Sequence, residues 1–489
     1  MNKPIRTISL FCLFLFLALM VNATWLQYAK SQDYADDPLN RRVIEAAYAA
    51  ERGAILVGRD PVAESKPVDD KYEFLREYAE PEKYAHLTGY FSYFSQTGVE
   101  QTQNRVLSGD DDLLFVTKLV DLLSGKAGKG GNVQLTIDRA AQDAAYDALD
   151  ALPGEVEASV VALEPDTGKI LAMASLPSYD PNELASHDFP SVLDAYERLD
   201  GADDEPLVNR AVRTTLPPGS TFKLVTAAAA IENGDYEASD DVPGGVSYQL
   251  PQTSGDSGLI DNEGRSCGTD TIPFEQAMGN SCNTTFAQLG VQLGEEKLRE
   301  QAEAFGFNQD YFDELGPQSV SNFPERANPP QTGQSAIGQF EVQATPLQMA
   351  MVAAGIANQG TVMRPYLVDE VQSPTFEVLR QTQPEELSEA VSASTADQLT
   401  DLMVYTVEEG TANPAAISGI SVAGKTGTAQ SGNPDVPPYA WFVSFAPADD
   451  PQVAVAVLVE SSDTSRSEIG GGRLGGPIAK AVMEAVINQ

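Results

Sequence analysis

The chain has 489 residues, of which 42% are hydrophobic, so it can bury a substantial core and is long enough for about three domains at roughly 150 residues each. Its net charge is −40, from 31 basic and 71 acidic side chains, and such a surface repels polyanions, which excludes nucleic acid as an expected partner. Two histidines and three cysteines offer no Cys/His cluster with metal-ligand spacing, so we expect no metal site.

Residues 1–27 have the pattern of a membrane anchor. Two basic residues precede an apolar run from Ile8 to Val21, which reaches the length of about 20 residues that a bilayer requires when it is extended to Leu26. Basic residues on the N-terminal side place the remainder outside the cytoplasm. A cleaved signal peptide is the alternative. Trp25 and Tyr28 suit a membrane interface and favour the uncleaved anchor.

Residues 28–131 predict a smaller, non-catalytic domain. Residues 36–51 have a helical pattern, and residues 52–56 break from it into a strand. Residues 60–120 are polar and rich in aromatic side chains, without a catalytic constellation. The Gly/Lys-rich stretch 124–131 is typical of a linker, so we expect a domain boundary there.

Residues 132–489 predict a larger α/β domain. The expected strands are 133–137, 159–164, 169–174, 419–426, 440–445 and 453–460, and the expected terminal helices are 139–152 and 477–487. Short turns join the last two strands, which should therefore be antiparallel. We expect hairpins from opposite ends of the domain to form one antiparallel sheet, with the helical region 205–400 covering one of its faces.

The first of three short motifs is Ser220-Thr221-Phe222-Lys223, at the start of an apolar segment that predicts a buried helix as far as Ile231. A serine at a helix N-terminus lies where free backbone N–H groups favour negative charge. Lys223 lies one turn later on the same face, where partial desolvation favours its neutral form. It can then take the Ser220 proton. A serine that caps a helix and a lysine on the protein surface would produce the same sequence motif, so this motif alone does not decide the function.

The second motif is Ser281-Cys282-Asn283. Ser281 and Asn283 are two residues apart, so in an extended loop their side chains face the same way. Ser281 can relay a proton to a leaving amine, and Asn283 can hold a substrate amide and the Lys223 ammonium. The alternative is an ordinary N-cap for a helix over residues 284–293.

The third motif, Lys425-Thr426-Gly427-Thr428, is expected at the end of the strand that begins near Gly419. Lys425 supplies positive potential, and the Thr426 and Thr428 hydroxyls can bind a carboxylate. Gly427 permits close backbone approach of a ligand. The backbone N–H groups of Ser220 and Thr428 can form an oxyanion hole, in which one donor contributes about 3 kcal/mol.

Residues 419–426 also match the phosphate-binding pattern G-x-x-x-x-G-K-[ST]. A true P-loop follows a strand and opens a helix. Here the segment itself is strand-like, and the proline-containing residues 430–438 exclude a helix after it. We therefore expect no nucleotide binding.

Cys267 and Cys282 lie fifteen positions apart and can pair outside the cytoplasm. A loop of that size contributes about 3 kcal/mol to stability, and the bond would hold the Ser281 loop beside Ser220. Two separate buried thiols are the alternative. Cys12 is an apolar residue of the anchor.

The three motifs, in this order, resemble the monofunctional class B penicillin-binding proteins, most closely the actinobacterial penicillin-binding protein A type. The resemblance covers nearly the whole chain. It also rests on residues 161–175, 217–223, 338–339, 344–348, 410–411, 424–430 and 441–442. It implies the penicillin-binding transpeptidase fold, a central antiparallel sheet flanked by helices, with a smaller N-terminal domain and a membrane anchor.

The resemblance implies a peptidoglycan D,D-transpeptidase that cross-links stem peptides through an acyl-enzyme on Ser220. Lys223 is then the base, Ser281 passes a proton to the departing D-Ala, and Asn283 orients the donor peptide. The Lys425-Thr426-Gly427-Thr428 segment holds the donor carboxylate. β-Lactams imitate D-Ala-D-Ala and acylate the same serine. The family needs no metal or cofactor, and its members often work with a polytopic glycosyltransferase of the elongation or division machinery.

Two other functions use the same motifs. One is a D,D-carboxypeptidase or β-lactamase-like hydrolase, although the length of the chain and its anchor argue against a compact β-lactamase. The other is a non-enzymatic penicillin sensor that is acylated without transferring the acyl group.

Overall fold

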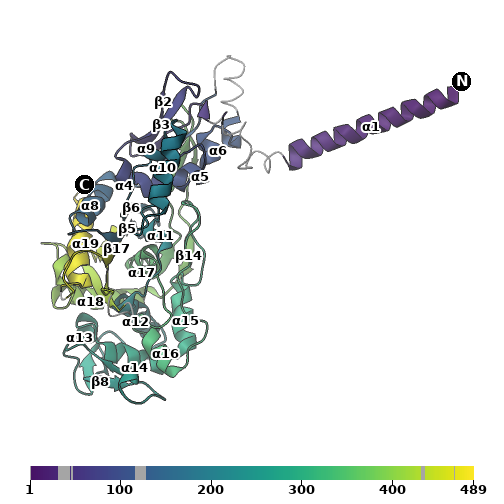
Figure 1. The fold of residues 1–489 in the computed structure, drawn as a ribbon. Helices are drawn as coiled ribbons and strands as arrows, with labels where there is room; N and C mark the ends of the chain where they lie inside the picture. The colour runs from purple at the N-terminus through teal and green to yellow at the C-terminus, as the bar shows by residue number, and fades with distance from the viewer. Residues whose placement is uncertain are drawn as a thin grey trace.

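The computed structural model describes residues 2–30, 45, 48–115, 128–430, 436–466 and 468–488. Helix α1 spans Asn2–Ala29 (Figure 1), and its side chains from Lys3 onward are exposed and mostly apolar. By length and composition it is the one helix among the described residues that can cross a membrane. Most of the predicted helix 36–51 and part of the predicted linker 124–131 lie outside the described residues.

One of the two main sheets has five antiparallel strands in the order β15-β16-β17-β5-β6. Their bounds are β5 Glu157–Leu163, β6 Ile170–Leu176, β15 Ala423–Ala429, β16 Tyr439–Ala446 and β17 Val453–Ser461. The pairing of β17 with β5 joins hairpins from opposite ends of the domain, which confirms the predicted sheet. Because both faces are covered, β5, β6, β16 and β17 are almost continuously apolar rather than alternating, and β15 is buried but polar.

Helices cover both faces of this sheet. Helices α8 (Arg139–Asp150) and α19 (Gly471–Ile487) pack together on one face, and Figure 1 shows the C-terminus beside α8. The core on the other face includes α12 (Lys223–Glu232), α17 (Pro346–Ala357) and α18 (Ala393–Glu408). The middle of the chain therefore covers the second face, as predicted.

A second sheet has six strands in the order β13-β12-β4-β1-β2-β3. Their bounds are β1 Ile55–Val57, β2 Asp60–Pro67, β3 Phe74–Tyr78, β4 Asn132–Leu135, β12 Val368–Gln372 and β13 Val378–Gln381. Strand β1 pairs in parallel with β4, and β4 pairs with β12. The sheet therefore crosses the predicted domain boundary between residues 131 and 132 and joins the N-terminal part to the larger domain.

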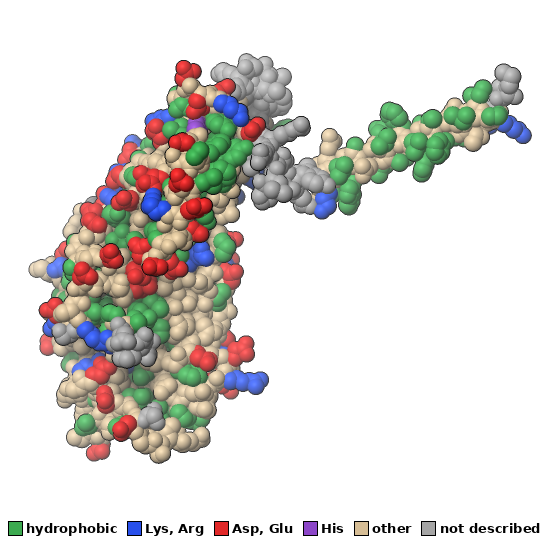
Figure 2. Space-filling model, viewed as in Figure 1, with side chains coloured by type: hydrophobic (Ala, Val, Ile, Leu, Met, Phe, Trp, Pro, Cys, Tyr) green, Lys and Arg blue, Asp and Glu red, His purple; other side chains and the backbone are tan. Residues whose placement is uncertain are grey.

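Further α-helices and pairs of strands complete the described part of the chain. They are α4 Pro81–Thr88, α5 Gly98–Thr102, α6 Asn104–Leu107, α9 Asn182–Ala185, α10 Phe189–Asp200, α11 Arg210–Arg213, α13 Phe274–Gly279, α14 Asn283–Leu293, α15 Glu295–Ala304, α16 Pro329–Ser335, and the strand pairs β7 Asp241–Pro243 with β10 Thr271–Pro273, β8 Ser247–Gln249 with β9 Leu259–Asp261, and β11 Thr361–Met363 with β14 Glu386–Glu389. Acidic side chains are spread over the body of the protein in the view of Figure 2, in keeping with its net charge.

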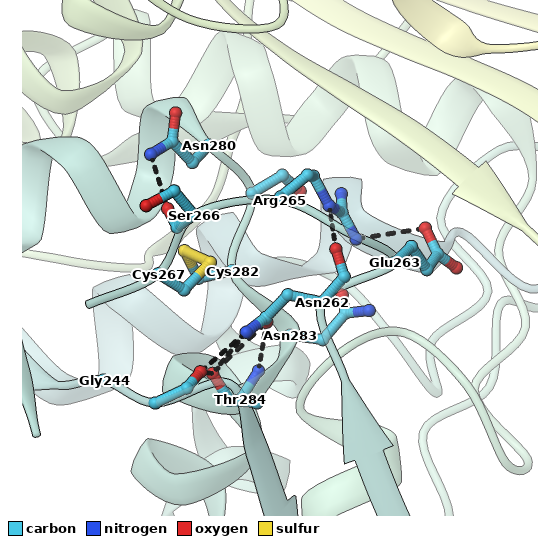
Figure 3. Close-up of a disulfide and its surroundings, with 12 residues drawn as sticks. Gly244, Asn262, Glu263, Arg265, Ser266, Cys267, Asn280, Cys282, Asn283 and Thr284 are labelled. Atoms are coloured by element: carbon cyan, nitrogen blue, oxygen red, sulfur yellow. Dashed lines mark hydrogen bonds and ion pairs between the residues drawn. A yellow bond between two sulfur atoms is a disulfide. The ribbon is translucent and has the colours of Figure 1, made fainter. Parts of the chain in front are cut away.

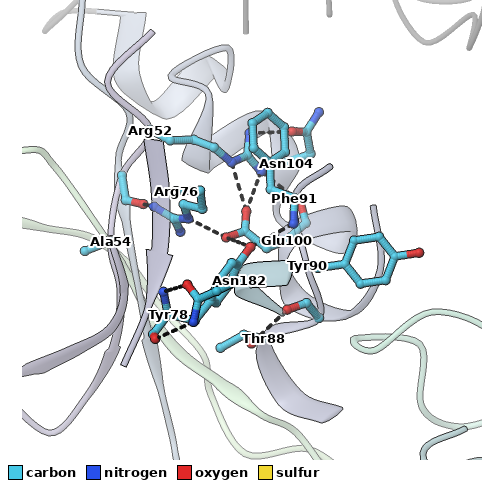
Figure 4. A network of polar contacts seen from close by, with 12 residues as sticks. Arg52, Ala54, Arg76, Tyr78, Thr88, Tyr90, Phe91, Glu100, Asn104 and Asn182 are labelled. Atoms are coloured by element: carbon cyan, nitrogen blue, oxygen red, sulfur yellow. Dashed lines mark hydrogen bonds and ion pairs between the residues drawn. The ribbon is translucent and has the colours of Figure 1, made fainter. Parts of the chain in front are cut away.

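A buried charge network joins the six-stranded sheet to α5 (Figure 4). The Glu100 carboxylate accepts hydrogen bonds from Arg52 Nε at 2.9 Å and Arg76 Nε at 2.6 Å. Arg76 also donates to the Gly53 carbonyl at 2.7 Å. All three charged side chains are almost completely buried. Burial alone would raise the pKa of Glu100, but the two guanidinium groups hold that pKa below its ordinary value.

Three predicted boundaries are wrong. The strand expected from Gly419 begins at Ala423, because Gly419 has φ +81° and lies in a turn before the strand. The last helix begins at Gly471 rather than Pro477. Its glycines have low helix propensity but pack closely, since a Cβ at position 471 would lie 1.9 Å from the Trp441 carbonyl oxygen. The helix expected from Ser220 begins at Lys223.

Candidate active site

Ser220 lies in a 3₁₀ turn, Gly219–Phe222, immediately before α12. Gly219 has φ +54°, and its N–H donates to the Gly338 carbonyl at 3.0 Å. A Cβ on Gly338 would lie 2.1 Å from the Gly219 carbonyl oxygen, so only glycine allows these two backbones to meet. Ser220 is 9% exposed and opens onto a cleft.

Lys223 is fully buried one turn after Ser220. Its Nζ donates to the Ser281 carbonyl at 2.8 Å, to Ser281 Oγ at 3.3 Å and to Asn283 Oδ1 at 2.7 Å. Burial lowers its pKa well below the ordinary value, and the charges of Lys425 and Arg265 lower that pKa further. Among the hydrogen bonds of the described residues none joins Lys223 to Ser220.

Ser281 and Asn283 contact Lys223 together, but not from an extended loop as predicted. Ser281 has φ +56°, in the left-handed region, and Asn283 is the first residue of α14. Asn283 Nδ2 donates to the Asp261 carbonyl at 3.0 Å, which leaves Oδ1 facing Lys223. The left-handed turn at Ser281 thus brings its side chain to Lys223, on the same side as Asn283, which an extended loop was expected to do.

Lys425 lies in the interior of β15, at the edge of the five-stranded sheet, rather than at a strand end. Its buried Nζ donates to Ser281 Oγ at 2.8 Å, so the Ser281 hydroxyl accepts from both lysines. Burial and the Arg265 charge lower the pKa of Lys425 well below its ordinary value. Because β15 continues to Ala429, residues 419–426 lack the helix that a P-loop opens.

Gly427 makes room for the chain itself rather than directly for a ligand. A Cβ there would lie 2.9 Å from the Pro218 carbonyl oxygen and 2.9 Å from Trp441 Cβ. The missing side chain lets β15 pack against the turn that carries Ser220. Thr426 Oγ1 lies 2.8 Å from Thr411 Oγ1, and the Thr428 side chain is exposed beside the cleft.

The cleft has a volume of about 210 Å³ and brings together five of the residues singled out from the sequence. It is lined by Ser220, Ser281, Asn283, Thr426 and Thr428, and in addition by Glu263, Arg265, Ile337, Gln339 and Gln430. Gln339 and Gln430 lie in segments that carried the family resemblance. No pattern in the sequence marked Glu263 or Arg265, which reach the cleft only through the folding of residues 250–270.

Cys267 and Cys282 are joined by a disulfide, with their Cα atoms 5.8 Å apart. Figure 3 shows the bond between the loop that carries Arg265 and the residue that precedes α14. Beside it, Asn262 Oδ1 accepts from the Thr284 N–H at 3.0 Å. The cross-link therefore lies directly behind Ser281 and Asn283.

Comparison with known proteins assigns the family. Residues 158–484 match the model of the penicillin binding protein transpeptidase domain, and residues 52–133 match the penicillin binding protein A dimerisation domain. The chain belongs to the penicillin-binding protein transpeptidase family. Over the full length of both chains it is 41% identical to the peptidoglycan D,D-transpeptidase PbpA of Mycolicibacterium smegmatis. It is 40% identical to PbpA of Mycobacterium tuberculosis, over 100% of this chain and 99% of that one.

Solved structures of this family show the same fold. The ceftriaxone acyl-enzyme complex of penicillin-binding protein A from M. tuberculosis superposes with a TM-score of 0.86 at 39% identity, and covers 91% of this chain and 100% of that one. The predicted family, its PbpA type, the transpeptidase fold and the class of serine D,D-transpeptidase are thereby confirmed.

Proposed function

We propose that this penicillin-binding protein cross-links peptidoglycan stem peptides with Ser220 as its nucleophile. Ser220 Oγ attacks the carbonyl of the D-Ala-D-Ala bond, the amide C–N bond breaks, and an ester forms on Ser220 as D-Ala leaves. An amine of a neighbouring stem peptide then attacks the ester, forms a new amide and returns the proton to Ser220. β-Lactams acylate the same oxygen.

The observation that carries this proposal is the buried Lys223, whose Nζ lies at the Ser281 hydroxyl beside the cleft that holds Ser220. Its lowered pKa favours the neutral amine that a general base requires. Lys223 takes the Ser220 proton, and Ser281 passes a proton to the departing amine. Catalytic hydrogen bonds are often long before substrate binds, so the absence of a bond between Lys223 and Ser220 is compatible with this role.

The donor peptide lies along β15 in this proposal. Because β15 is an edge strand of its sheet, an extended peptide can add to it through backbone hydrogen bonds. Asn283 orients the donor amide, and Lys425, Thr426 and Thr428 bind its terminal carboxylate, with Gly427 keeping the strand against the serine turn. The N–H groups of Ser220 and Thr428 form the oxyanion hole.

We assign residues 1–27 to a single-pass membrane anchor, residues 28–131 to a non-catalytic domain, and residues 132–489 to an extracytoplasmic transpeptidase domain. The apolar helix α1 supports the anchor. A polytopic glycosyltransferase is the proposed partner, since strand formation and cross-linking act on one polymer at the membrane surface.

Mass-spectrometric mapping of the penicillin adduct tests the nucleophile. We expect the adduct on Ser220 and no labelling of Ser220→Ala; an adduct on another residue would refute the assignment. Transfer to an amine acceptor from a lipid-linked donor tests the reaction. Rapid release of bound penicillin would favour the hydrolase, and stable labelling without any transfer product would favour the sensor.

A further inference from the structure

Three buried aromatic rings pack together at the end of the turn that carries Ser220. Phe222 is the last residue of that turn and precedes Lys223. Its ring lies nearly parallel to the Phe323 ring, with centroids 5.7 Å apart, and edge to face with the Phe307 ring, with centroids 5.6 Å apart. This aromatic cluster is fully buried. A movement of Phe222 would therefore shift both Ser220 and Lys223, its near neighbours in the chain.

Asn308 joins the two ends of the loop that separates Phe307 from Phe323 in the sequence. Its Oδ1 accepts from the Phe323 N–H at 2.9 Å, and its Nδ2 donates to the Phe323 carbonyl at 3.1 Å and to Glu303 Oε1 at 3.2 Å. The Asn308 N–H donates to the Ser321 carbonyl at 2.7 Å. Asn308 has φ +62°, a left-handed conformation that asparagine tolerates better than most residues. Its side chain thus fixes the backbone of Phe323.

The turn that carries Ser220 is held separately at its start and at its end. At its start, the Gly219 N–H donates to the Gly338 carbonyl at 3.0 Å. At its end, the Phe222 ring rests on the two other rings of the aromatic cluster. Because a proton transfer requires its two heavy atoms to come within hydrogen-bond reach, the end of the turn influences how closely Lys223 Nζ can approach the Ser220 hydroxyl.

We propose that Asn308 is a positioning residue for the acylation of Ser220. By joining the ends of its loop, Asn308 keeps the Phe323 ring on Phe222, and Phe222 in turn sets the distance between Lys223 Nζ and Ser220 Oγ in the substrate complex. Asn308 is not among the described residues that line the cleft, so it acts through the aromatic cluster and not by contact with substrate. The proposal rests on the roles of nucleophile and base assigned above.

Penicillin acylation of the full-length protein in detergent tests this role, because its concentration dependence gives the dissociation constant of the reversible complex and the rate constant of acylation separately. Asn308→Gly keeps the left-handed backbone without strain and removes every hydrogen bond of the side chain. We expect the rate constant to fall about tenfold, since a misplacement of about 1 Å can cost up to about a hundredfold. The dissociation constant should stay unchanged, because the residues that line the cleft are intact.

A second variant and a control separate positioning from loss of stability. Phe323→Leu keeps the position apolar but removes the ring that lies on Phe222, so it should lower the rate constant as Asn308→Gly does. The double variant should be no slower than the slower single variant, since both changes break the same connection. Asn358→Gly removes another side-chain hydrogen bond, from Asn358 Nδ2 to the Thr361 carbonyl at 3.0 Å, just after the end of α17. It should lower the Tm but leave both constants at their wild-type values.

A wild-type rate constant in Asn308→Gly, or an equal loss in Asn358→Gly, would overturn the positioning role. A rise in the dissociation constant in place of a slower acylation step would do the same. Losses that multiply in the double variant would show that Asn308 does not act through Phe323, and would also overturn it. Each of these results leaves the proposed function intact. An adduct that maps to a residue other than Ser220 in the wild type would instead refute the proposed function.

Discussion

Removal of the disulfide between Cys267 and Cys282 should destabilise the transpeptidase domain and slow its acylation. The bond closes a loop of fifteen residues, so in the chain-entropy model it stabilises the folded state by about 3 kcal/mol. With an unfolding entropy of about 2.1 cal/mol/K per residue over residues 158–484, that loss lowers the Tm by roughly 4 °C.

The chemical effect should be smaller than a loss of the nucleophile. Backbone hydrogen bonds from Ser281 to Met278 and from Cys282 to Ala277 remain, so the Ser281 turn keeps its shape. The loop that carries Arg265 is then no longer covalently attached beside Asn283. We therefore expect the second-order rate constant for penicillin acylation to fall by about tenfold, since a small misplacement of a site residue has effects of this order.

The double variant Cys267→Ala/Cys282→Ala tests this without creating an unpaired thiol in the site. Its Tm and acylation rate are compared with those of the wild type, each with and without dithiothreitol. Reduction should bring the wild type to the values of the variant and leave the variant unchanged, which also controls for Cys12 in α1. An unaltered Tm in the variant would refute the entropic reasoning, and an unaltered acylation rate would refute the role in positioning.

Three other changes test the site and the fold. Gly427→Ala places a Cβ 2.9 Å from the Pro218 carbonyl oxygen. The resulting strain of about 1–3 kcal/mol should push the turn that carries Ser220 away from β15 and reduce the rate of penicillin acylation at least about tenfold. An acylation rate equal to that of the wild type would contradict this expectation. Glu100→Gln leaves two buried guanidinium groups without a counter-charge and should lower the free energy of unfolding by about 3–5 kcal/mol. Because the pKa of Glu100 is lowered in the folded state, its ionised form stabilises the fold above the unfolded pKa of about 4.3, and this stabilisation is lost as the pH falls through the folded pKa. The Tm of the wild type should therefore fall more steeply with acid than the Tm of the variant. Arg265→Gln removes a charge that lowers the pKa of Lys223, so the acidic limb of the penicillin acylation profile should move to higher pH; an unmoved limb would show that Arg265 does not act on the base.

Apolar periodicity predicted most of the central sheet. Strands β5, β6, β16 and β17 begin and end within about two residues of their expected bounds, because their buried residues form unbroken apolar runs. The start of α19 could not be predicted in this way. Its glycines are dictated by the close approach of Trp441, a tertiary contact that outweighs helix propensity.

The candidate site likewise contains residues that the sequence predicted and residues that it could not predict. Ser220, Lys223, Ser281, Asn283 and the Lys425 segment are recognisable because they occur in short motifs. Arg265 and Glu263 reach the cleft through a loop whose course is set by the bonds of Asn262 and by the disulfide. Such contacts leave no periodic signal, so these two residues were visible only in the folded chain.

The shared hydroxyl of Ser281 couples the protonation of the two lysines. Its Oγ accepts from Lys223 at 3.3 Å and from Lys425 at 2.8 Å, and both ammonium groups are buried. Two positive charges on one buried oxygen are unfavourable, so the pair titrates as a unit and gives up one proton well below the ordinary lysine pKa. Each lysine faces the charge of the other and that of Arg265, and we infer that Lys223, one turn after Ser220, is the member that becomes neutral, as its proposed role as the base requires. Neutral Lys223 then keeps two N–H groups for the Ser281 carbonyl and Asn283 Oδ1, and in the proposed mechanism its lone pair accepts the proton of Ser220. Once protonated, Lys223 donates this proton to Ser281 Oγ as the Ser281 hydroxyl gives its own proton to the leaving amine, while Lys425 keeps the positive charge that a substrate carboxylate requires.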